Sequence, residues 1–352
     1  MANGDAAYSQ DEATCLIDLK SPVYWEQANG VLLDLNTLTD NSTFVPTQPI
    51  SGYRIKSIMF GAANPIGYED PRATRDGVDV ADAYIGRRLI QINVDLYGTT
   101  RQDLAGKLEA IVKMMRFIPK KFQASDGFRR LKFTLLTADT TNFPTGKIEA
   151  YAVCRPAQMP QVETNPSMFS GNDDAGYSTG IVLAFIMKSP YKFSDVLKES
   201  AVGITGTAVN LHNHGSAPSY AELIIEKTYG GSPATNSALV KFTVTLNGTP
   251  LTLSFAAGTL GDDATYKYRV LINYDEQIVY DSKLTKATSA VSNTINQKYI
   301  VINSGALFGL IDPDDDHYGA SPSTVSITCA DASNNPITTG YTASISWREA
   351  WY

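Results

Sequence analysis

Acidic side chains alternate in one short segment near the end of the chain. Asp312, Asp314 and Asp316 have the spacing of the first three ligands of a calcium-binding loop. The rest of that pattern fails, because the sixth position is His317 instead of glycine and the twelfth is Ser323 instead of glutamate. The sequence therefore predicts an acidic loop between two strands and no resident metal, with chance binding of a divalent cation as the alternative.

Histidine chemistry has few candidates in this chain, because its three histidines are His212, His214 and His317. His212-Asn213-His214 has the letters of a nuclease triplet, but the helix and the spaced metal ligands that such a site needs do not follow it. The signatures of serine hydrolases, P-loop proteins, zinc proteases and dinucleotide-binding proteins are absent as well. We therefore expect no catalytic residues, no cofactor and no enzymatic activity.

Two features could serve carbohydrate chemistry. Glycoside hydrolysis needs two carboxylates about 5–10 Å apart, but nothing in the placement of the acidic residues selects a pair. Tyr266, Tyr268, Tyr274 and Tyr280 could stack on sugar rings, although tyrosines are also ordinary surface residues of strands. A carbohydrate-binding or carbohydrate-cleaving β-sandwich protein that recognises a host surface is therefore the alternative function.

The composition favours a β-rich globular chain. Charged residues make up 18% of the 352 residues and hydrophobic residues 43%, with many tyrosines, threonines and valines. The length favours two domains. The net charge of −7 makes the chain a poor nucleic-acid binder, because affinity for phosphate comes mainly from Lys and Arg. An acidic wall would nevertheless suit a channel through which DNA slips without sticking.

The chain shows no targeting signal that we recognise. Its first residues lack a basic region followed by an apolar run, and no stretch approaches about 18 consecutive apolar residues. We expect no signal peptide, no membrane span, and synthesis in a cytoplasm. Cys15, Cys154 and Cys329 are odd in number and far apart, which favours free thiols.

One strand followed by one helix is the clearest pattern of the first half. Strict alternation over residues 88–96 predicts a strand with one wet face. Residues 100–117 predict a helix, with Thr99 or Thr100 as N-cap and Pro119 as the stop. If Thr100 is the N-cap, Asp103 stands at the third helical position, in the manner of a capping box. Its apolar stripe consists of Leu104, Leu108, Ile111, Val112 and Met115.

Further strands are expected at residues 131–135, 147–155 and 179–188. The helix should pack on the sheet that these strands form, which gives an α+β first domain. From residue 202 onward the pattern predicts only strands, the first over 202–210, and Asn247-Gly248 is a strong tight-turn signal.

The predicted fold class is therefore mainly β. Residues 1–200 form an N-terminal β-sandwich or barrel-like sheet domain with one packed helix. Residues 201–352 form a C-terminal β-sandwich, because many short strands with turn signals at regular intervals are typical of that architecture.

Residues 61–86 are predicted to form a long loop, since they hold two prolines, four glycines and no usable period. Loops of more than about 12–15 residues are uncommon in compact domains and are often functional. The alternatives are a floppy insertion and a segment that orders against a neighbouring subunit. The candidate interface residues are Pro65, Ile66, Tyr68, Pro71, Arg72 and Arg75.

Several segments resemble, in order and spacing, the distal tail proteins of long-tailed bacteriophages (siphophages). They are the strand-to-helix run of residues 86–108, Tyr151-Ala-Val-Cys-Arg-Pro156, Ser189-Pro-Tyr-Lys-Phe193, Asn213-His-Gly-Ser-Ala-Pro-Ser-Tyr220 and Ser346-Trp-Arg-Glu-Ala-Trp351. The hairpin over 271–280 and the loop over 310–316 occur in the expected order as well. The resemblance covers nearly the whole chain, although none of its pieces is a strict motif.

The resemblance implies a structural protein of the tail tip. Members of that family form a ring, usually a hexamer, by extending sheets between subunits, and an arm called the belt wraps the neighbour. Residues 61–86 match that arm. The ring joins the tail tube to the baseplate hub, and DNA passes through its lumen without specific binding. The second domain is implied to be galectin-like.

The partners implied by the resemblance are further copies of the chain, the tail tube protein, the tail hub and tape measure proteins, and a receptor-binding protein for host attachment. The protein would then be part of a virion assembled in the bacterial cytoplasm. A tail-tube subunit is a third interpretation, but tube subunits usually need only the first unit. The long segment over 1–50 and the 156–178 loop depart from the leanest members of the family.

Overall fold

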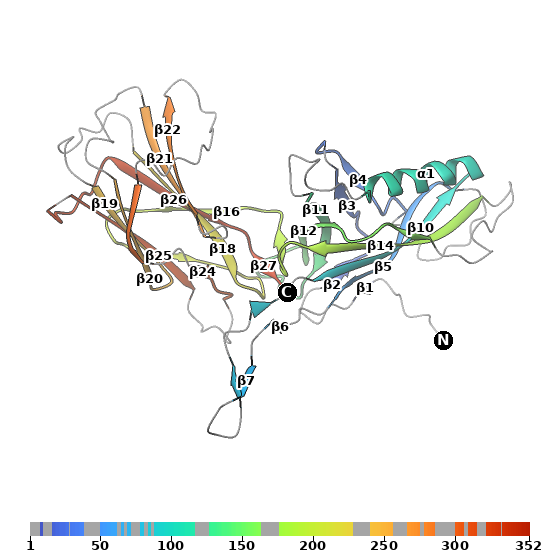
Figure 1. Cartoon of the computed structure of the whole chain (residues 1–352), viewed down its shortest axis with the longest axis horizontal. Helices are drawn as coiled ribbons and strands as arrows, with labels where there is room; N and C mark the ends of the chain where they lie inside the picture. Colours follow the sequence, from blue (N-terminus) through green and yellow to red (C-terminus); the bar gives the residue numbers. More distant parts are fainter. Residues whose placement is uncertain are drawn as a thin grey trace. The chain divides into compact units, whose positions relative to one another are not determined.

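The computed structural model describes residues 8–9, 16–27, 29–38, 50–61, 65–66, 69–71, 78–80, 84–85, 88–116, 127–162, 176–227, 240–255, 266–274, 278–285, 300–305, 309–314, 322–331 and 333–352. The chain divides into two compact units, Met1–Asp195 with Trp351–Tyr352, and Val196–Ala350. Figure 1 shows that both units consist mainly of strands. The predicted mainly β fold class is therefore confirmed.

The first unit is built on a twelve-stranded antiparallel sheet. Its main path runs, from edge to edge, through β1 (Tyr8–Ser9), β2 (Leu16–Asp18), β11 (Arg129–Leu136), β12 (Lys147–Pro156), β14 (Tyr177–Met187), β10 (Leu89–Gly98) and β5 (Gly52–Phe60). The strands beside this path are β3 (Tyr24–Glu26), β4 (Leu32–Asp34), β13 (Gln161–Val162), β15 (Lys192–Ser194) and β27 (Ala350–Trp351). The end strands β1 and β5 come near each other, so the sheet curls toward a barrel.

Strand β10 lies in the middle of the first core. Ile90, Ile92, Val94 and Leu96 are fully buried, while the residues between them are partly exposed. This is the burial that strict alternation predicts for a strand with one covered face. β10 pairs with β14 on one side and with β5 on the other.

Helix α1 (Arg101–Met114) covers part of this sheet and packs on β10 and β14 (Figure 1). The Thr100 hydroxyl accepts a hydrogen bond from the Asp103 amide at 3.1 Å, and the Asp103 carboxylate accepts one from the Thr99 amide at 3.0 Å. The predicted helix and its N-cap are thereby confirmed. Leu104, Ile111 and Met115 are buried in the first core. No helix in the described part of the chain has the length and hydropathy needed to cross a membrane.

The segment of residues 61–86, called the arm from here on, contains paired strands. β6 (Pro65–Ile66) pairs with β9 (Tyr84–Ile85), and β7 (Glu69–Pro71) pairs with β8 (Val78–Val80). The second pair lies inside the first in the sequence, and the two antiparallel pairs together are called the arm ribbon. The prediction of a loop without strands is wrong here. Strands of two or three residues are too short to show a period in the sequence.

The second unit is a sandwich of two sheets. The six-stranded sheet holds, in order, β16 (Lys198–Val202), β26 (Tyr341–Trp347), β18 (Ser219–Lys227), β21 (Tyr266–Asn273) and β22 (Ile278–Thr285), with β24 (Leu310–Ile311) beside β18. The five-stranded sheet holds β17 (Val209–Leu211), β25 (Ser323–Ala330), β19 (Val240–Leu246), β20 (Thr249–Phe255) and β23 (Ile300–Gly305). Side chains of both sheets share one core, in which the Phe242 and Tyr341 ring centroids lie 5.1 Å apart.

Two details of the second unit bear on the sequence predictions. Asn247 and Gly248 both have positive φ, 48° and 81°, as the two-residue turn between β19 and β20 requires. The single strand expected over 202–210 is wrong, because β16 ends at Val202 and β17 begins at Val209. The chain changes sheets between these strands, which a pattern of apolar residues does not reveal.

Candidate functional site

The base of the arm is the best-defined candidate site of the first unit. The arm leaves the sheet after Phe60 in β5 and returns at Arg88, directly before β10. The Gly61 amide donates to the Leu89 carbonyl at 2.7 Å, and Arg88 Nε donates to the Gly61 carbonyl at 2.8 Å. The Arg88 carbonyl accepts from the Met187 amide at 2.9 Å. Both ends of the arm are therefore bonded to each other and to the end of β14.

Two buried cations lie at this base. Lys192 is fully buried and Arg88 is 4% exposed. Lys192 Nζ lies 4.9 Å and Arg88 Cζ 5.7 Å from the centroid of the Phe60 ring. A desolvated cation–π contact is worth about 2 kcal/mol, which offsets part of the cost of burying a charge. The Phe60 ring, directly before the arm, thus contacts Arg88, just after the arm, and Lys192 of β15.

Exposed apolar side chains lie beside the base. Met59 of β5 is 45% exposed and Leu89 of β10 is 47% exposed. Met59 pairs with Gln91, which lies two residues beyond Leu89 on the same strand. Met59 and Leu89 therefore lie on the same face of the sheet. This face offers apolar area next to the arm.

Of the six residues predicted for the subunit interface, three lie in described strands and three lie outside the described residues. Pro65 and Ile66 form β6, and Pro71 ends β7, so these three lie on the arm ribbon. Tyr68, Arg72 and Arg75 lie outside the described residues. The contact of all six with a second subunit stays a prediction.

Sequence reasoning missed the anchor of the arm, Arg88 and Lys192. Arg88 stands directly before the alternating strand, and Lys192 stands between Tyr191 and Phe193. The sequence signal that could have indicated a buried cation was a basic residue beside apolar or aromatic neighbours. It did not show that the two side chains, far apart in the sequence, share one ring.

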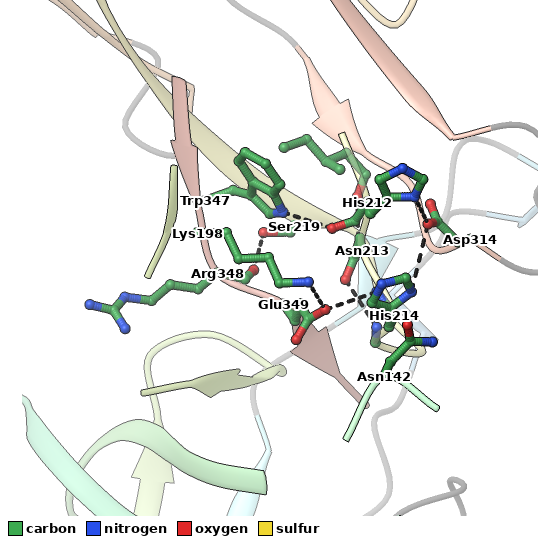
Figure 2. A network of polar contacts seen from close by, with 12 residues as sticks. Asn142, Lys198, His212, Asn213, His214, Ser219, Asp314, Trp347, Arg348 and Glu349 are labelled. Carbon is green, nitrogen blue, oxygen red and sulfur yellow. Dashed lines mark hydrogen bonds and ion pairs between the residues drawn. The ribbon is translucent and has the colours of Figure 1, made fainter. Parts of the chain in front are cut away.

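A polar cluster in the second unit holds the turn before β18 (Figure 2). Asn213 is buried, and its Nδ2 donates to the carbonyls of Ala217 at 2.9 Å and Ile311 at 3.1 Å. Its Oδ1 accepts from the Gly215 amide at 3.1 Å. These bonds satisfy a buried amide through the backbone around it. They favour the structural interpretation of His212-Asn213-His214 over the nuclease interpretation.

The two histidines of this cluster face one carboxylate. His212 Nδ1 lies 2.7 Å and His214 Nδ1 3.7 Å from Asp314 Oδ2, and the two rings stack with centroids 5.8 Å apart (Figure 2). The Asp312 carboxylate instead accepts from Asn247 Nδ2. The two described carboxylates of the acidic loop thus have separate partners, and Asp316 lies outside the described residues. Within the part of the chain that the structure describes, no group of three or more His, Cys, Asp or Glu side chains could hold a metal ion.

The same cluster holds the segment that follows β26. Glu349 is 2% exposed, accepts from the His214 amide at 3.2 Å and forms an ion pair with Lys198. Trp347 Nε1 donates to the His212 carbonyl at 3.0 Å. Figure 2 shows these side chains converging on the turn. The cluster therefore serves to position backbone.

The other candidates for chemistry are buried. Cys154 and Cys329 are free thiols in the two cores. Burial raises the pKa of both, that of Cys329 to about 12, so neither is a thiolate nucleophile near neutral pH. Cys15 lies outside the described residues. Tyr274 is buried as well, and it has no exposed ring face on which a sugar could stack.

Neither the family models nor the curated proteins compared with the chain gave a match. Among solved structures, the crystal structure of the Dit protein of phage SPP1 aligns with 94% of this chain and 99% of its own, with a TM-score of 0.50 and 11% identity. It is described as a paradigm of the hub adsorption apparatus in phages that infect Gram-positive bacteria. Two structures of the phage P2 baseplate in its activated conformation, with Ca and with Sr, cover 92% of this chain and 97% and 96% of their own. Their TM-scores are 0.41 and 0.37, both at 9% identity.

The alignment with the SPP1 protein spans the sheet-and-helix unit and the sandwich together, since it covers nearly the full length of both chains. Identity as low as 11% leaves the sequences too different to transfer residue roles. The chain therefore has the fold of a phage distal tail protein of the Dit type.

Proposed function

We propose that this chain is a structural component of the tail tip of a long-tailed bacteriophage. The observation that carries the proposal is the alignment of both units with the SPP1 Dit protein at a TM-score of 0.50. In this role, copies of the chain close into a ring between the tail tube and the baseplate hub. The presence of the complete second sandwich favours this role over that of a tail-tube subunit.

The arm supplies the proposed contact between neighbouring copies. A ring closes when one head-to-tail interface repeats with a rotation that returns to the start. A ribbon of short strands offers backbone donors and acceptors for strand addition to a neighbour. The contacts of Arg88 and Lys192 with Phe60 support this role, because they fix the residues directly before and just after the arm. The exposed apolar surface of Met59 and Leu89 can be buried in the proposed contact between copies.

The remaining partners follow from the proposed place in the particle. The ring binds the tail tube protein on one side, and the tail hub with the tape measure protein on the other, and the sandwich unit carries parts that bind the receptor-binding protein. The net charge of −7 favours a lumen through which DNA passes without sticking, since tight binding of phosphate needs Lys and Arg. The chain performs no reaction in this role.

Deletion of residues 63–84 tests the proposal directly. The deletion removes the ribbon and leaves Gly61, Arg88 and their hydrogen bond in place. We expect both units to stay folded, as judged by circular dichroism and melting, and ring closure to be lost, as judged by size-exclusion chromatography and electron microscopy. Rings of normal appearance from the deletion variant would contradict the role of the arm.

A further inference from the structure

The first unit is discontinuous in sequence, because the whole second unit, Val196–Ala350, lies between Asp195 and Trp351. Trp351 is 2% exposed and belongs to the first core, where its ring centroid lies 6.2 Å from that of Phe143. Tyr352 packs edge-on against Tyr191 at 5.4 Å. The first core is therefore incomplete without Trp351, which is synthesised after the second unit.

The residues just before Trp351 are held by the second unit. Ala350 is fully buried, and its carbonyl accepts from the Ala217 amide at 3.0 Å. A Cβ added to Gly215 would lie 1.9 Å from that same carbonyl oxygen, so the backbones pass in close contact. The bonds of Glu349 to His214 and Lys198 lie on the same stretch (Figure 2).

Two further hydrogen bonds fix this stretch. The Ser219 hydroxyl donates to the Arg348 carbonyl, and the Trp347 indole donates to the His212 carbonyl (Figure 2). Every residue from 347 to 350 thus has a contact inside the second unit. Residues 347–352, called the strap from here on, are held by the second unit at one end and by the first core at the other.

We propose that the strap couples the folding of the first unit to that of the second. The first core closes around Trp351 only when the cluster of His212, Asn213 and Glu349 has fixed the backbone of Ala350. Since Ala350 and Trp351 are consecutive, a displacement of the first is passed directly to the second. Removal of a large aromatic side chain from a core is among the most destabilising changes known for proteins, so a displaced strap loosens the first unit measurably.

The coupling has a consequence for assembly, and this part of the inference rests on the proposed function. If the first unit carries the arm and forms the ring, a chain whose second unit is unfolded offers an incomplete ring-forming unit. Such a chain would be excluded from the ring. The strap would therefore act as a check that both units are folded before a subunit is incorporated.

Hydrogen exchange of the full-length chain tests the coupling, with two glycine substitutions as a matched pair. Gly215→Ala places a Cβ against the strap at Ala350. Gly305→Ala places a Cβ 2.1 Å from the Pro250 carbonyl oxygen, in the same unit but at the end strand β23. We expect Gly215→Ala to raise exchange in β11, β12 and β15 about tenfold or more. Under conditions in which protection of β18 and β25 shows that the second unit is still folded, Gly305→Ala should leave exchange in β11, β12 and β15 unchanged.

Glu349→Gln provides a milder variant in case Gly215→Ala does not fold. It keeps the volume of the side chain and removes its charge opposite Lys198, and it should raise exchange in the same three strands to a smaller extent. Unchanged exchange in these strands for both strap variants would overturn the inference. An equal increase for Gly305→Ala while β18 and β25 stay protected would overturn it too, because the effect would then not pass through the strap.

Exchange is measured at concentrations below association, so its result does not depend on ring formation. If the wild-type chain forms no rings but exchange follows the expected pattern, the proposed function is wrong and the strap inference holds. If rings form and Gly215→Ala leaves hydrogen exchange in the first unit unchanged, the inference is wrong and the proposed function holds.

Discussion

Arg88 Nε donates a hydrogen bond of 2.8 Å to the carbonyl oxygen of Gly61, and this bond joins the two points at which the arm leaves and re-enters the sheet. The Arg88 guanidinium is also the side chain that faces the Phe60 ring from the returning strand. The arm is thus held at its base by a side chain that stands just beyond its end. The stability of this base is open to direct measurement.

Arg88→Met should destabilise the first unit by about 1–3 kcal/mol, since it leaves a carbonyl of the base without its donor and removes a cation–π contact. Chemical denaturation followed by fluorescence measures the change in free energy of unfolding. Arg116→Met is the matched control, because Arg116 is an exposed arginine just beyond the helix. Equal losses for the two variants would show that the base contributes nothing specific.

Met59→Ser combined with Leu89→Ser should weaken association of the chain while leaving its melting temperature nearly unchanged. Both side chains are about half exposed in the isolated chain. Their burial between two copies would stabilise the association by roughly 25 cal/mol per Å² of apolar surface, and serine in their place would lose this contribution. Sedimentation velocity over a range of concentrations reads the change. The control combines Val31→Ser with Ile302→Ser, two similarly exposed side chains that belong to neither β5 nor β10, and should leave association as in the wild type. The idea fails if both double variants weaken association alike.

Asp18 should make the first unit less stable in acid. Burial by itself raises the pKa of the Asp18 carboxyl, but hydrogen bonds from Lys147, Ser21 and the Lys20 amide outweigh burial and hold the pKa below its usual range. Since the pKa is lower in the folded than in the unfolded chain, the stabilisation is fully present above the unfolded value of about 3.9 and is lost as the pH falls below it.

Asp18→Asn should therefore lower the free energy of unfolding at pH 7 by about 1–3 kcal/mol, and the difference from the wild type should shrink as the pH falls through about 4 toward 2. Urea denaturation at a series of pH values provides the test. A difference that stays constant across the series would refute the assignment to the charged carboxylate.

Thr100→Ala should cost about 1 kcal/mol, because the Thr100 hydroxyl is the N-cap acceptor for the Asp103 amide. Thr99→Ala is a close control, since Thr99 contributes mainly its backbone amide to the Asp103 carboxylate and keeps that amide when the side chain is shortened. Thermal unfolding of the two variants compares them. Similar losses at both positions would argue against the cap as the source of the effect.

The helix and its cap were predictable from the sequence because their signals are local. Thr100, Asp103 and the apolar stripe all lie within a few turns of one segment. The alternation of β10 was visible for the same reason. The turn at Asn247-Gly248 needed only two residues, whose positive φ other residue types rarely adopt.

The parts that the sequence did not reveal depend on contacts between distant segments. Lys192 and Arg88 share the Phe60 ring through the fold alone. Trp351 is separated from its partner Phe143 by the whole second unit, and no periodicity connects them. The short strands of the arm and the change of sheets after Val202 were missed because both depend on which strands pair with each other. A local sequence pattern does not contain that information.

The central claim is that copies of this chain close into a ring, and imaging the purified full-length protein together with its mass in solution tests it most directly. The account predicts, with increasing concentration, a shift from 38.2 kDa toward a closed assembly of about six copies, seen by electron microscopy as a ring with a central opening. A chain that remains a monomer at every concentration, with no ring in any image, would contradict it.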